Sequence, residues 1–281
     1  MDLSARLNEI APIEPHGGIL VKRNDLIRFG DGINGLKAVG CLSLLYDALT
    51  QGTKTIVTLG ARTSPQCLII SYLCSTLGLT AHLYMPSSAI LTELQERCIG
   101  YGATIHPVTG GFNNQLERAV AKHAKDHPEH RVFGFGMSST STIGLLARQT
   151  VNIPANIKHI TCPIGSGHNI CALLCGLSKA GRTDISVTGV FTGAMTAPEE
   201  YIRSHAPHDI QLDLQTFFPD AIKPANRYAK KKAAVLGDLP LHPIYEGKCY
   251  DFLRRDLGES ELLWIVGGPT DDNPRRAKWH S

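Results

Sequence analysis

Short apolar runs alternate with longer amphipathic segments from residue 54 to residue 194, and apolar runs return near the C-terminus. The runs are rich in β-branched residues and end at glycine or polar turn residues, which is typical of strands. The segments between them carry apolar residues at helical spacing, and several stop at a glycine, as at Gly78 and Gly102. The pattern predicts strands over 54–60, 81–85, 103–108, 131–135, 157–163, 185–191 and 262–266, and helices over 36–49, 65–77, 86–101, 113–125, 142–150, 168–180 and 246–257.

This alternation predicts the fold class. Strands that alternate with helices over short connections form parallel sheets with the helices on the sheet faces. Because the pattern restarts after Pro154, we expect an α/β protein with two lobes. The small lobe is predicted over 45–145, and the large lobe over 1–44 plus 146–281. Residues 195–243 are richer in proline and charge and receive no assignment.

The composition narrows the class of protein further. Of 281 residues, 43% are hydrophobic and 19% charged, which is typical of a globular protein and excludes collagen, coiled coil and disorder. The longest apolar runs, such as Cys67–Cys74, fall far short of the ~20 residues that a membrane span needs. The N-terminus has an acid, Asp2, and no apolar core, so we expect no signal peptide and a cytoplasmic protein.

The cysteines and histidines predict neither disulfides nor a metal site. The eight cysteines form no CxxC pair, and several lie among apolar residues, so buried free thiols in a reducing compartment are expected. The twelve histidines include no HExxH motif. His123, His127 and His130 fall on or after a polar stretch, where a solvent-facing helix is favoured over a ligand set.

The charge balance does not favour a nucleic-acid partner but leaves one open. Lys and Arg number 28 against 25 Asp and Glu, a net charge of +3. That field is too weak to argue for nucleic-acid binding by itself. The basic segments Arg227–Lys232, Arg254–Arg255 and Arg275–Lys278 are interpreted as solvated surface.

A glycine turn lies between the predicted strand 157–163 and the next helix, with the sequence Gly165-Ser166-Gly167-His168-Asn169. Such a turn gathers unpaired N–H groups at a helix N-terminus, where the helix dipole adds positive potential. Two interpretations are equally open, a phosphate cradle and a tight structural turn. The spacing matches neither a P-loop nor GxGxxG.

Lys37 stands at the start of the predicted helix 36–49 among apolar residues. A lysine in such a place is either a surface side chain that extends its amine to water or a desolvated amine. Desolvation lowers the pKa of the amine and makes it a nucleophile toward an aldehyde.

Three motifs in this order resemble the fold-type-II, tryptophan-synthase β-like family of pyridoxal-phosphate enzymes. Asn34–Gly40 is similar to the Schiff-base lysine motif of threonine synthase and diaminopropionate ammonia-lyase. Gly165–Asn169 is similar to the family's phosphate loop. Pro243-Ile244-Tyr245-Glu246-Gly247-Lys248 resembles a motif of aminocyclopropane-carboxylate deaminase and D-cysteine desulfhydrase. The resemblance spans about 19–269 and implies a two-lobed, three-layer α/β/α fold with mostly parallel sheets.

The resemblance also implies a pyridoxal 5'-phosphate cofactor, a small amino-acid-like substrate and a homodimer. Lys37 would form the Schiff base, and Tyr245 would lie beside the ring or act as an acid. Glu246 would stabilise the protonated pyridine, although a helix-end acid is the plainer interpretation of that residue alone. The other implied contacts are Asn34, Gly165, Ser166, Gly167, His168 and Asn169 for the cofactor, and Thr63, Ser64 and Gln66 for the substrate.

Three positions depart from the family pattern. Pro65 replaces the asparagine of the substrate loop and removes one N–H donor, His168 stands where many members have glycine, and Val266 stands where many have Ser or Thr.

Lyase or deaminase chemistry is the first expectation for the reaction. Decarboxylation is an alternative, since Pro65 alters the loop that would hold the substrate carboxylate. A substrate carried on a nucleic acid, and a catalytically silent binding protein on the same fold, are the others.

Overall fold

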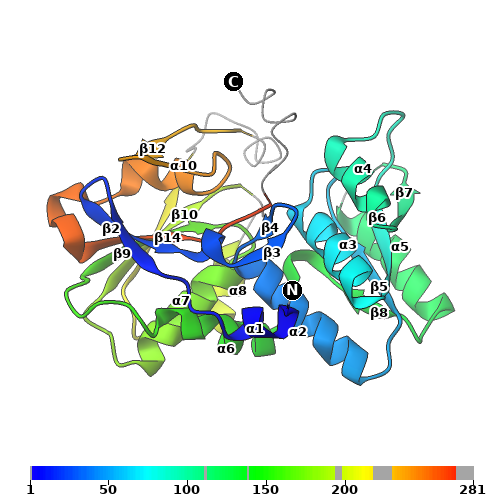
Figure 1. The fold of residues 1–281 in the computed structure, drawn as a ribbon, viewed down its shortest axis with the longest axis horizontal. Coiled ribbons are helices and arrows are strands. Elements are labelled where there is room, and N and C mark those ends of the chain that lie inside the picture. The colour runs from blue at the N-terminus through cyan, green and yellow to red at the C-terminus, as the bar shows by residue number, and fades with distance from the viewer. Residues whose placement is uncertain (1, 111–112, 138, 194–197, 218–229, 270–281) are drawn as a thin grey trace.

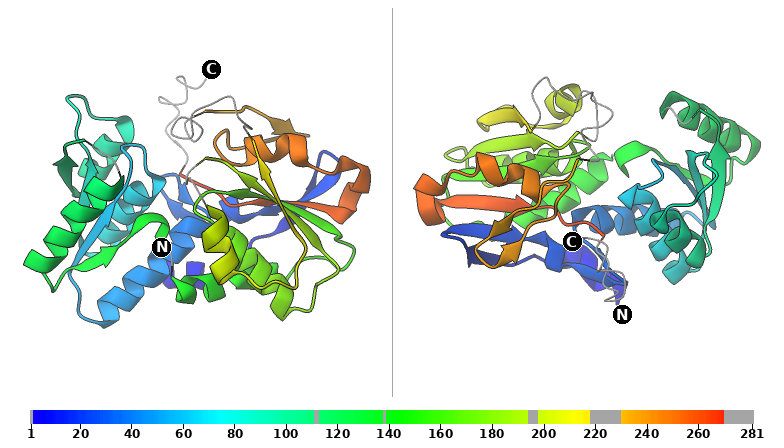
Figure 2. Two further views of the ribbon diagram at one scale, coloured as in Figure 1. Left: turned by 180° about the vertical axis from the view of Figure 1, so that it is seen from behind. Right: turned by 90° about the horizontal axis from the view of Figure 1, so that it is seen from above.

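The computed structural model describes residues 2–110, 113–137, 139–193, 198–217 and 230–269, which form two lobes around separate sheets (Figure 1). The views in Figure 2 place these sheets at opposite ends of the molecule. The four-stranded sheet uses strands between residues 55 and 133, and the six-stranded sheet uses strands before residue 24 and after residue 158. The lobe boundaries at 44/45 and 145/146 stay a prediction.

The smaller sheet is parallel throughout, in the order β7-β6-β5-β8. Alternate residues of β5 enter different cores: Ile56 joins the main core with Leu68 of α3, and Val57 packs with Leu116 and Val120 of α5. The sheet is therefore a middle layer between helices. Its elements are β5 (Thr55–Leu59), α3 (Pro65–Leu77), β6 (Thr80–Pro86), α4 (Glu93–Gly100), β7 (Thr104–Val108), α5 (Asn113–Asp126) and β8 (Arg131–Phe133).

The larger sheet runs β1-β2-β14-β9-β10-β11, and only the β1–β2 pair is antiparallel. Its two faces also enter separate cores. Leu262 of β14 joins the main core with Leu173 of α7, while Leu263 packs with Cys249 of α10 on the other face. The strands are β1 (Ile13–His16), β2 (Ile19–Arg23), β9 (His159–Ile164), β10 (Ser186–Phe191), β11 (Leu212–Thr216) and β14 (Glu261–Ile265).

Further helices and short elements surround and connect the two sheets. The helices are α1 (Leu3–Asn8), α2 (Leu36–Thr50), α6 (Thr140–Ala147), α7 (His168–Lys179), α8 (Pro198–His205) and α10 (Glu246–Cys249). The two-stranded pairs are β3 (Arg28–Gly30) with β4 (Ile33–Asn34), and β12 (Val235–Leu236) with β13 (Leu239–Pro240). The 3-10 turns are η1 (Asn24–Leu26), η2 (Phe135–Met137), η3 (Arg148–Thr150), η4 (Tyr250–Phe252) and η5 (Arg255–Ser260).

The predicted helix over 246–257 is wrong. The α-helix ends at Cys249, a 3-10 turn follows, and Leu253 is extended. Tyr250, Phe252 and Leu253 all pack on the same apolar cluster. A continuous helix would point residues two apart, such as Tyr250 and Phe252, away from each other. Packing of these side chains therefore favours the broken backbone.

The helix predicted over 86–101 begins seven residues later. Pro86 ends β6, and the helix starts at Glu93. Thr92 and Gln95 form a capping box, in which each side chain accepts a hydrogen bond from the other residue's backbone N–H. This reciprocal cap fixes the start of the helix. In the unassigned segment 195–243, the structure places α8, β11 and the β12–β13 pair.

The thiol prediction is confirmed, because all eight cysteines are unpaired and only Cys175 is more than marginally accessible. The polar stretch before His127 is a helix that faces solvent, as predicted, and His127 is exposed. His123 departs from that prediction, because it lies on the inner side of the helix and is 8% exposed. Each helix in the described ranges is too short or too polar to cross a membrane. Of the basic segments, Arg227–Ala229 and Arg275–Lys278 lie outside the described residues.

Candidate active site

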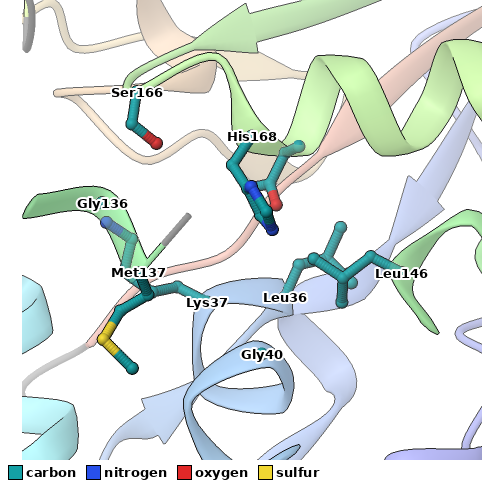
Figure 3. Close-up of a pocket in the computed structure, with 9 residues that line it drawn as sticks. Leu36, Lys37, Gly40, Gly136, Met137, Leu146, Ser166 and His168 are labelled. Atoms are coloured by element: carbon teal, nitrogen blue, oxygen red, sulfur yellow. The ribbon is translucent and has the colours of Figure 1, made fainter. Parts of the chain in front are cut away.

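A small pocket lies where strands of both sheets end (Figure 3). Ser166 follows the carboxyl end of β9, and Gly136 follows the carboxyl end of β8. Ligands of parallel α/β sheets bind at this edge, because the strands end there and their connecting loops converge. The lining residues are Leu36, Lys37, Gly40, Gly136, Met137, Leu146, Ser166, His168 and Asn169.

Lys37 enters the pocket from the first turn of α2 and is partly accessible there. Burial lowers the pKa of its amine, an effect that the nearby thiols of Cys41 and Cys67 partly offset. Within the described ranges, no hydrogen bond or ion pair engages the amine. A lysine amine with a lowered pKa is neutral over a wider pH range, and the neutral amine is the nucleophilic form.

The two thiols beside Lys37 do not compete with it. Burial raises the pKa of Cys41 and of Cys67 to about 12. Both therefore stay protonated at neutral pH, and the thiol is a far weaker nucleophile than the thiolate. The amine is the reactive group of this trio.

Two glycines fix the start of the helix that carries Lys37. Gly35 has φ +85°, and a Cβ there would lie 2.5 Å from the Val266 carbonyl oxygen. Gly267 has φ +72°, and a Cβ there would lie 2.7 Å from the Gly35 Cα. Leu36 N–H donates to the Val266 carbonyl at 2.9 Å. The backbone after β14 and the backbone before α2 thus touch directly, which only glycine permits.

Asn34 holds the same junction and does not line the pocket. Its Oδ1 accepts from the Gly268 N–H at 2.9 Å, and its Nδ2 donates to the Gly32 carbonyl at 3.2 Å. Both polar ends of this buried side chain are therefore engaged with backbone. The contribution of Asn34 in this structure is to position the turn before Lys37.

The glycine turn after β9 presents a helix N-terminus to the pocket. Gly167 is the N-cap of α7, with φ +87° and no side chain to cap the helix. Ser166 and Asn169 line the pocket on either side of it, and Gly165 begins the turn. N–H groups left without a side-chain cap carry the positive end of the helix dipole and favour an anion.

The His168 side chain is held by two hydroxyl groups. Thr142 donates its single hydroxyl hydrogen to the Ser139 carbonyl at 2.8 Å, so His168 Nε2–H donates to Thr142 at 2.6 Å. His168 Nδ1 then accepts from the Tyr201 hydroxyl at 2.9 Å. Burial, with a smaller effect from Lys37, lowers the pKa of His168 to about 4. The imidazole is neutral, and the residue offers an anion its backbone N–H.

Glu246 is a fully buried acid with an unused acceptor. Its Oε1 accepts from the Val266 N–H at 2.9 Å, while its Oε2 has no hydrogen-bond partner in the described structure. Burial raises the pKa of its carboxyl to about 7, although backbone hydrogen bonds oppose the shift. A buried carboxylate oxygen without a donor is costly, and a protonated ring nitrogen would remove that cost.

Tyr245 precedes Glu246 and lies against the glycine segment. Its ring centroid is 5.0 Å from that of His242, and a Cβ on Gly268 would approach the ring to 3.5 Å. Tyr245 is not among the residues that line the pocket. It packs on the segment that links β14 to the Lys37 helix.

The turn from Gly60 to Cys67 supplies the predicted substrate residues, and none of them lines the pocket. Thr63 is exposed, and Ser64 is the N-cap of α3 without a side-chain capping bond. The Ser64 hydroxyl bonds the Cys67 thiol, which lies near the Lys37 amine. Gln66 Nε2 donates to Thr58 Oγ1 and to the Gly134 carbonyl, both at 2.8 Å, and so ties β5 to the end of β8.

The sequence analysis missed part of the pocket. Met137 has φ +55°, a left-handed backbone that is uncommon outside glycine, and its side chain is buried at the pocket wall. Such strain gathers at functional sites. Gly40 lies three residues after Lys37 and so faces the same way, a signal the sequence does contain. The lining residues not anticipated are Leu36, Gly40, Gly136, Met137 and Leu146.

Comparison with known proteins identifies the family. Residues 5–232 match the family described as pyridoxal-phosphate dependent enzyme. The chain belongs to this family. The match covers the pocket, the smaller sheet and every strand of the larger sheet except β14. The fold is the α/β, tryptophan-synthase β-like fold of pyridoxal-phosphate enzymes with mostly parallel sheets.

Relatives of this pyridoxal-phosphate family member include two archaeal proteins. A "Putative 1-aminocyclopropane-1-carboxylate deaminase" of Pyrococcus abyssi is 26% identical over 280 residues, covering 89% of this chain and 84% of the relative. A protein of the same description from Pyrococcus horikoshii is 25% identical, with the same coverage.

Among solved structures, an ACC deaminase homologue matches with a TM-score of 0.70 at 20% identity, covering 96% of this chain and 93% of that one. Escherichia coli diaminopropionate ammonia lyase in apo form matches with a TM-score of 0.61 at 15% identity, covering 90% and 78%. These likenesses establish the fold.

The residues present fit pyridoxal phosphate. The cofactor has an aldehyde, a phosphate and a basic ring nitrogen. At the pocket the structure offers the Lys37 amine, whose pKa burial lowers, and the helix N-terminus at Gly167. Glu246 is fully buried and is not among the lining residues, and its Oε2 has no hydrogen-bond partner in the described structure. Each chemical feature of the cofactor therefore has a complementary group in the structure.

Proposed function

We propose that this chain binds pyridoxal 5'-phosphate through Lys37 and catalyses a lyase or deaminase reaction on a small amino acid. The observation that carries the proposal is the Lys37 amine, which has no hydrogen bond or ion pair with any residue that the structure describes, in a pocket that also receives the N-terminus of α7. A lysine kept for stability alone would pair with an acid or reach bulk water. The pyridoxal-phosphate family and the two archaeal deaminase relatives support this direction.

Lys37 has two tasks in this proposal. It would hold the cofactor in the pocket through a bond between its amine and the cofactor aldehyde, formed with loss of water. With a substrate bound, the Lys37 amine would accept a proton from the substrate α-carbon or return one to it. When bound, pyridoxal phosphate supplies an electron-withdrawing ring that accepts the electrons of the bond broken at the α-carbon.

The phosphate is held mainly by backbone. The N–H groups at the start of α7, from Gly167 to Asn169, point toward an anion at the helix N-terminus, and the Ser166 hydroxyl adds a donor. His168 contributes through its backbone, because Thr142 and Tyr201 occupy both ring nitrogens. This arrangement needs no lysine or arginine at the phosphate.

Glu246 would hold the ring nitrogen of the cofactor with Oε2, the oxygen that has no partner in the described structure. A cation at that atom favours the carboxylate over the buried neutral acid, and the pair keeps the ring nitrogen protonated. The Val266 N–H holds Oε1 and so fixes the direction of the carboxylate. Tyr245, on the adjoining segment, positions this side of the ring or acts as an acid.

The substrate carboxylate is bound by the turn before α3. Thr63 and Ser64 lie at that helix N-terminus, and the Ser64 side chain does not cap the helix. The turn therefore offers a hydroxyl and backbone N–H groups to an anion, without a donor from Pro65. Gln66 is the third residue assigned here, and it acts by holding the turn against β5 and β8.

Decarboxylation is the second candidate. The contacts that hold the substrate carboxylate would decide which bond at the α-carbon breaks. Pro65, in the first turn of α3, has no N–H and so removes one of the donors that would hold that carboxylate. A substrate carried on a nucleic acid, a silent binding role and the homodimer stay predictions.

One series of measurements tests the cofactor assignment. The purified full-length chain mixed with pyridoxal phosphate should develop a visible absorbance band that borohydride bleaches. Peptide mapping should then find the label on Lys37 and not on Lys22, a second buried lysine whose amine already donates to the Ala11 carbonyl and Asn152. Lys37→Ala should lose the band. A colourless chain, or a label elsewhere, contradicts the proposal.

The reaction type needs a separate assay of the holoenzyme. Release of ammonia and a keto acid from 1-aminocyclopropane-1-carboxylate, D-cysteine or diaminopropionate supports the deaminase assignment. Release of carbon dioxide with retention of the amine supports decarboxylation. A holoenzyme that carries out neither reaction on these substrates or on the common amino acids supports the silent binding protein.

A further inference from the structure

A group of histidines lies in the small lobe, away from the pocket. Two hydrogen bonds link its members in pairs, His82 Nδ1 with His106 Nε2 and His123 Nε2 with His130 Nδ1, both at 2.8 Å. Their rings contact one another across β6, β7 and α5, and the His82 and His123 centroids are 5.5 Å apart. None of these residues lines the pocket.

His127 and Glu129 bring two further ligand atoms to His130 in the turn between α5 and β8. Glu129 Oε1 lies 3.2 Å from His130 Nε2 and 3.6 Å from His127 Nδ1. In the described part of the chain, this is the one set of three metal-ligating side chains whose ligand atoms all lie within 4.8 Å of each other. Zinc binds histidine nitrogen and carboxylate oxygen at about 2.0–2.2 Å, which places neighbouring ligand atoms at about these separations.

The backbone holds this turn in shape. His127 N–H donates to the His123 carbonyl at 2.8 Å, and His130 N–H donates to the His127 carbonyl at 3.1 Å. The three ligands are therefore presented by one compact turn of four residues. Little chain entropy remains to be lost when an ion binds.

We propose that His127 Nδ1, Glu129 Oε1 and His130 Nε2 bind one divalent transition-metal ion of the zinc type. Three protein ligands leave a fourth position for water or an external ligand. Two imidazoles and one carboxylate suit zinc, copper or nickel better than magnesium or calcium, which prefer oxygen ligands.

Hydrogen bonds behind the ligands support the site. A metal on His130 Nε2 leaves the ring hydrogen on Nδ1, which donates to His123 Nε2. His123 Nδ1–H then donates to the Tyr84 hydroxyl at 2.7 Å. A ligating histidine commonly donates its second N–H to such an acceptor, and this bond orients the ring and raises its basicity.

Tag-free, full-length protein titrated with Zn²⁺ in a calorimeter tests the proposal. Wild type should bind one equivalent, and His127→Asn and Glu129→Gln should each lose at least tenfold in affinity. Both side chains are exposed, so neither variant is expected to affect folding. His123→Phe, which keeps all three ligands, should weaken binding about tenfold through the lost hydrogen bond. His208→Asn, at an exposed histidine elsewhere, is the matched control.

A spectroscopic measurement provides a second readout. Co²⁺ in the same site should give visible bands that His130→Ala abolishes and His208→Asn retains, while thermal unfolding without metal confirms that the His130 variant is folded. Absence of Zn²⁺ binding to the wild type, or wild-type affinity in both His127→Asn and Glu129→Gln, overturns the proposal. The Lys37→Ala protein should bind Zn²⁺ as wild type does, so this result is independent of the cofactor.

Discussion

The Glu246 carboxylate is hydrogen-bonded to the backbone of Val266, with Oε1 accepting from the N–H at 2.9 Å. The carbonyl of the same residue, Val266, accepts from the Leu36 N–H at the start of the helix that carries Lys37. One residue thus links the buried acid to the first turn of α2. Its side chain has no part in either bond, which is why a valine serves in this position.

Replacement of Glu246 tests its role toward the ring nitrogen. Glu246→Gln should lower kcat on the order of 10²-fold and change cofactor affinity less, because the lost interaction strengthens as charge develops on the ring. Steady-state kinetics at saturating cofactor measure the effect. Glu261→Gln is a matched control, since Glu261 is equally buried but lies at the opposite end of β14, bonded to His159 and Thr161. An unchanged kcat in Glu246→Gln would contradict the proposal that Glu246 keeps the ring nitrogen of the cofactor protonated.

The same carboxyl predicts a pH dependence of stability in the cofactor-free protein. Its folded-state pKa is raised to about 7 from the ordinary 4.5, so the folded state holds the proton more tightly than the unfolded state. This stabilisation is complete below about pH 4.5 and is lost as pH rises through about 7, about 3 kcal/mol in all. Urea unfolding of wild type and Glu246→Gln across pH 4.5–8 should show wild type losing this amount relative to the variant. Parallel curves would contradict the burial of the acid.

A pair of substitutions at Gly167 separates charge from backbone strain. Asp and Asn have nearly the same shape and both tolerate the left-handed backbone, so either should destabilise the turn similarly. Only Gly167→Asp adds a negative charge at the helix N-terminus, where a carboxylate would repel a bound phosphate by about 1–4 kcal/mol. Cofactor affinity, from titration of the visible band, should be about tenfold weaker in the Asp variant than in the Asn variant. Equal affinities would show that the turn is only structural.

The two ends of α2 offer a matched test of the glycine junction. Gly35 and Gly52 both have positive φ, but a Cβ at Gly52 would meet open space, whereas one at Gly35 would clash with the Val266 carbonyl. Gly52→Ala should cost about 1–2 kcal/mol of unfolding free energy, the cost of the backbone alone. Gly35→Ala should cost about 3 kcal/mol or more, since overpacking adds to the strain. Denaturant unfolding measures both, and similar losses would contradict the tight contact.

The sequence by itself determined the elements whose signals are local. The strand over 54–60 and the helix over 65–77 follow from apolar periodicity with Gly78 as the stop, and the structure confirms both within a residue or two. The glycine turn at 165–167 and the position of Lys37 at the start of a helix can also be predicted from neighbouring residues. Each depends on a few adjacent residues, so no knowledge of distant contacts is needed.

Tertiary structure alone decided how distant residues combine. Gln66 was predicted to face a substrate, but its side-chain amide donates hydrogen bonds to Thr58 and to the Gly134 carbonyl. Tyr201, 33 residues after His168 in the sequence, forms a hydrogen bond with the His168 ring. The helix predicted over 246–257 breaks because its apolar side chains share one core face. These outcomes depend on contacts between separate helices and strands. The sequence pattern within one helix or strand does not show which other elements will pack against it.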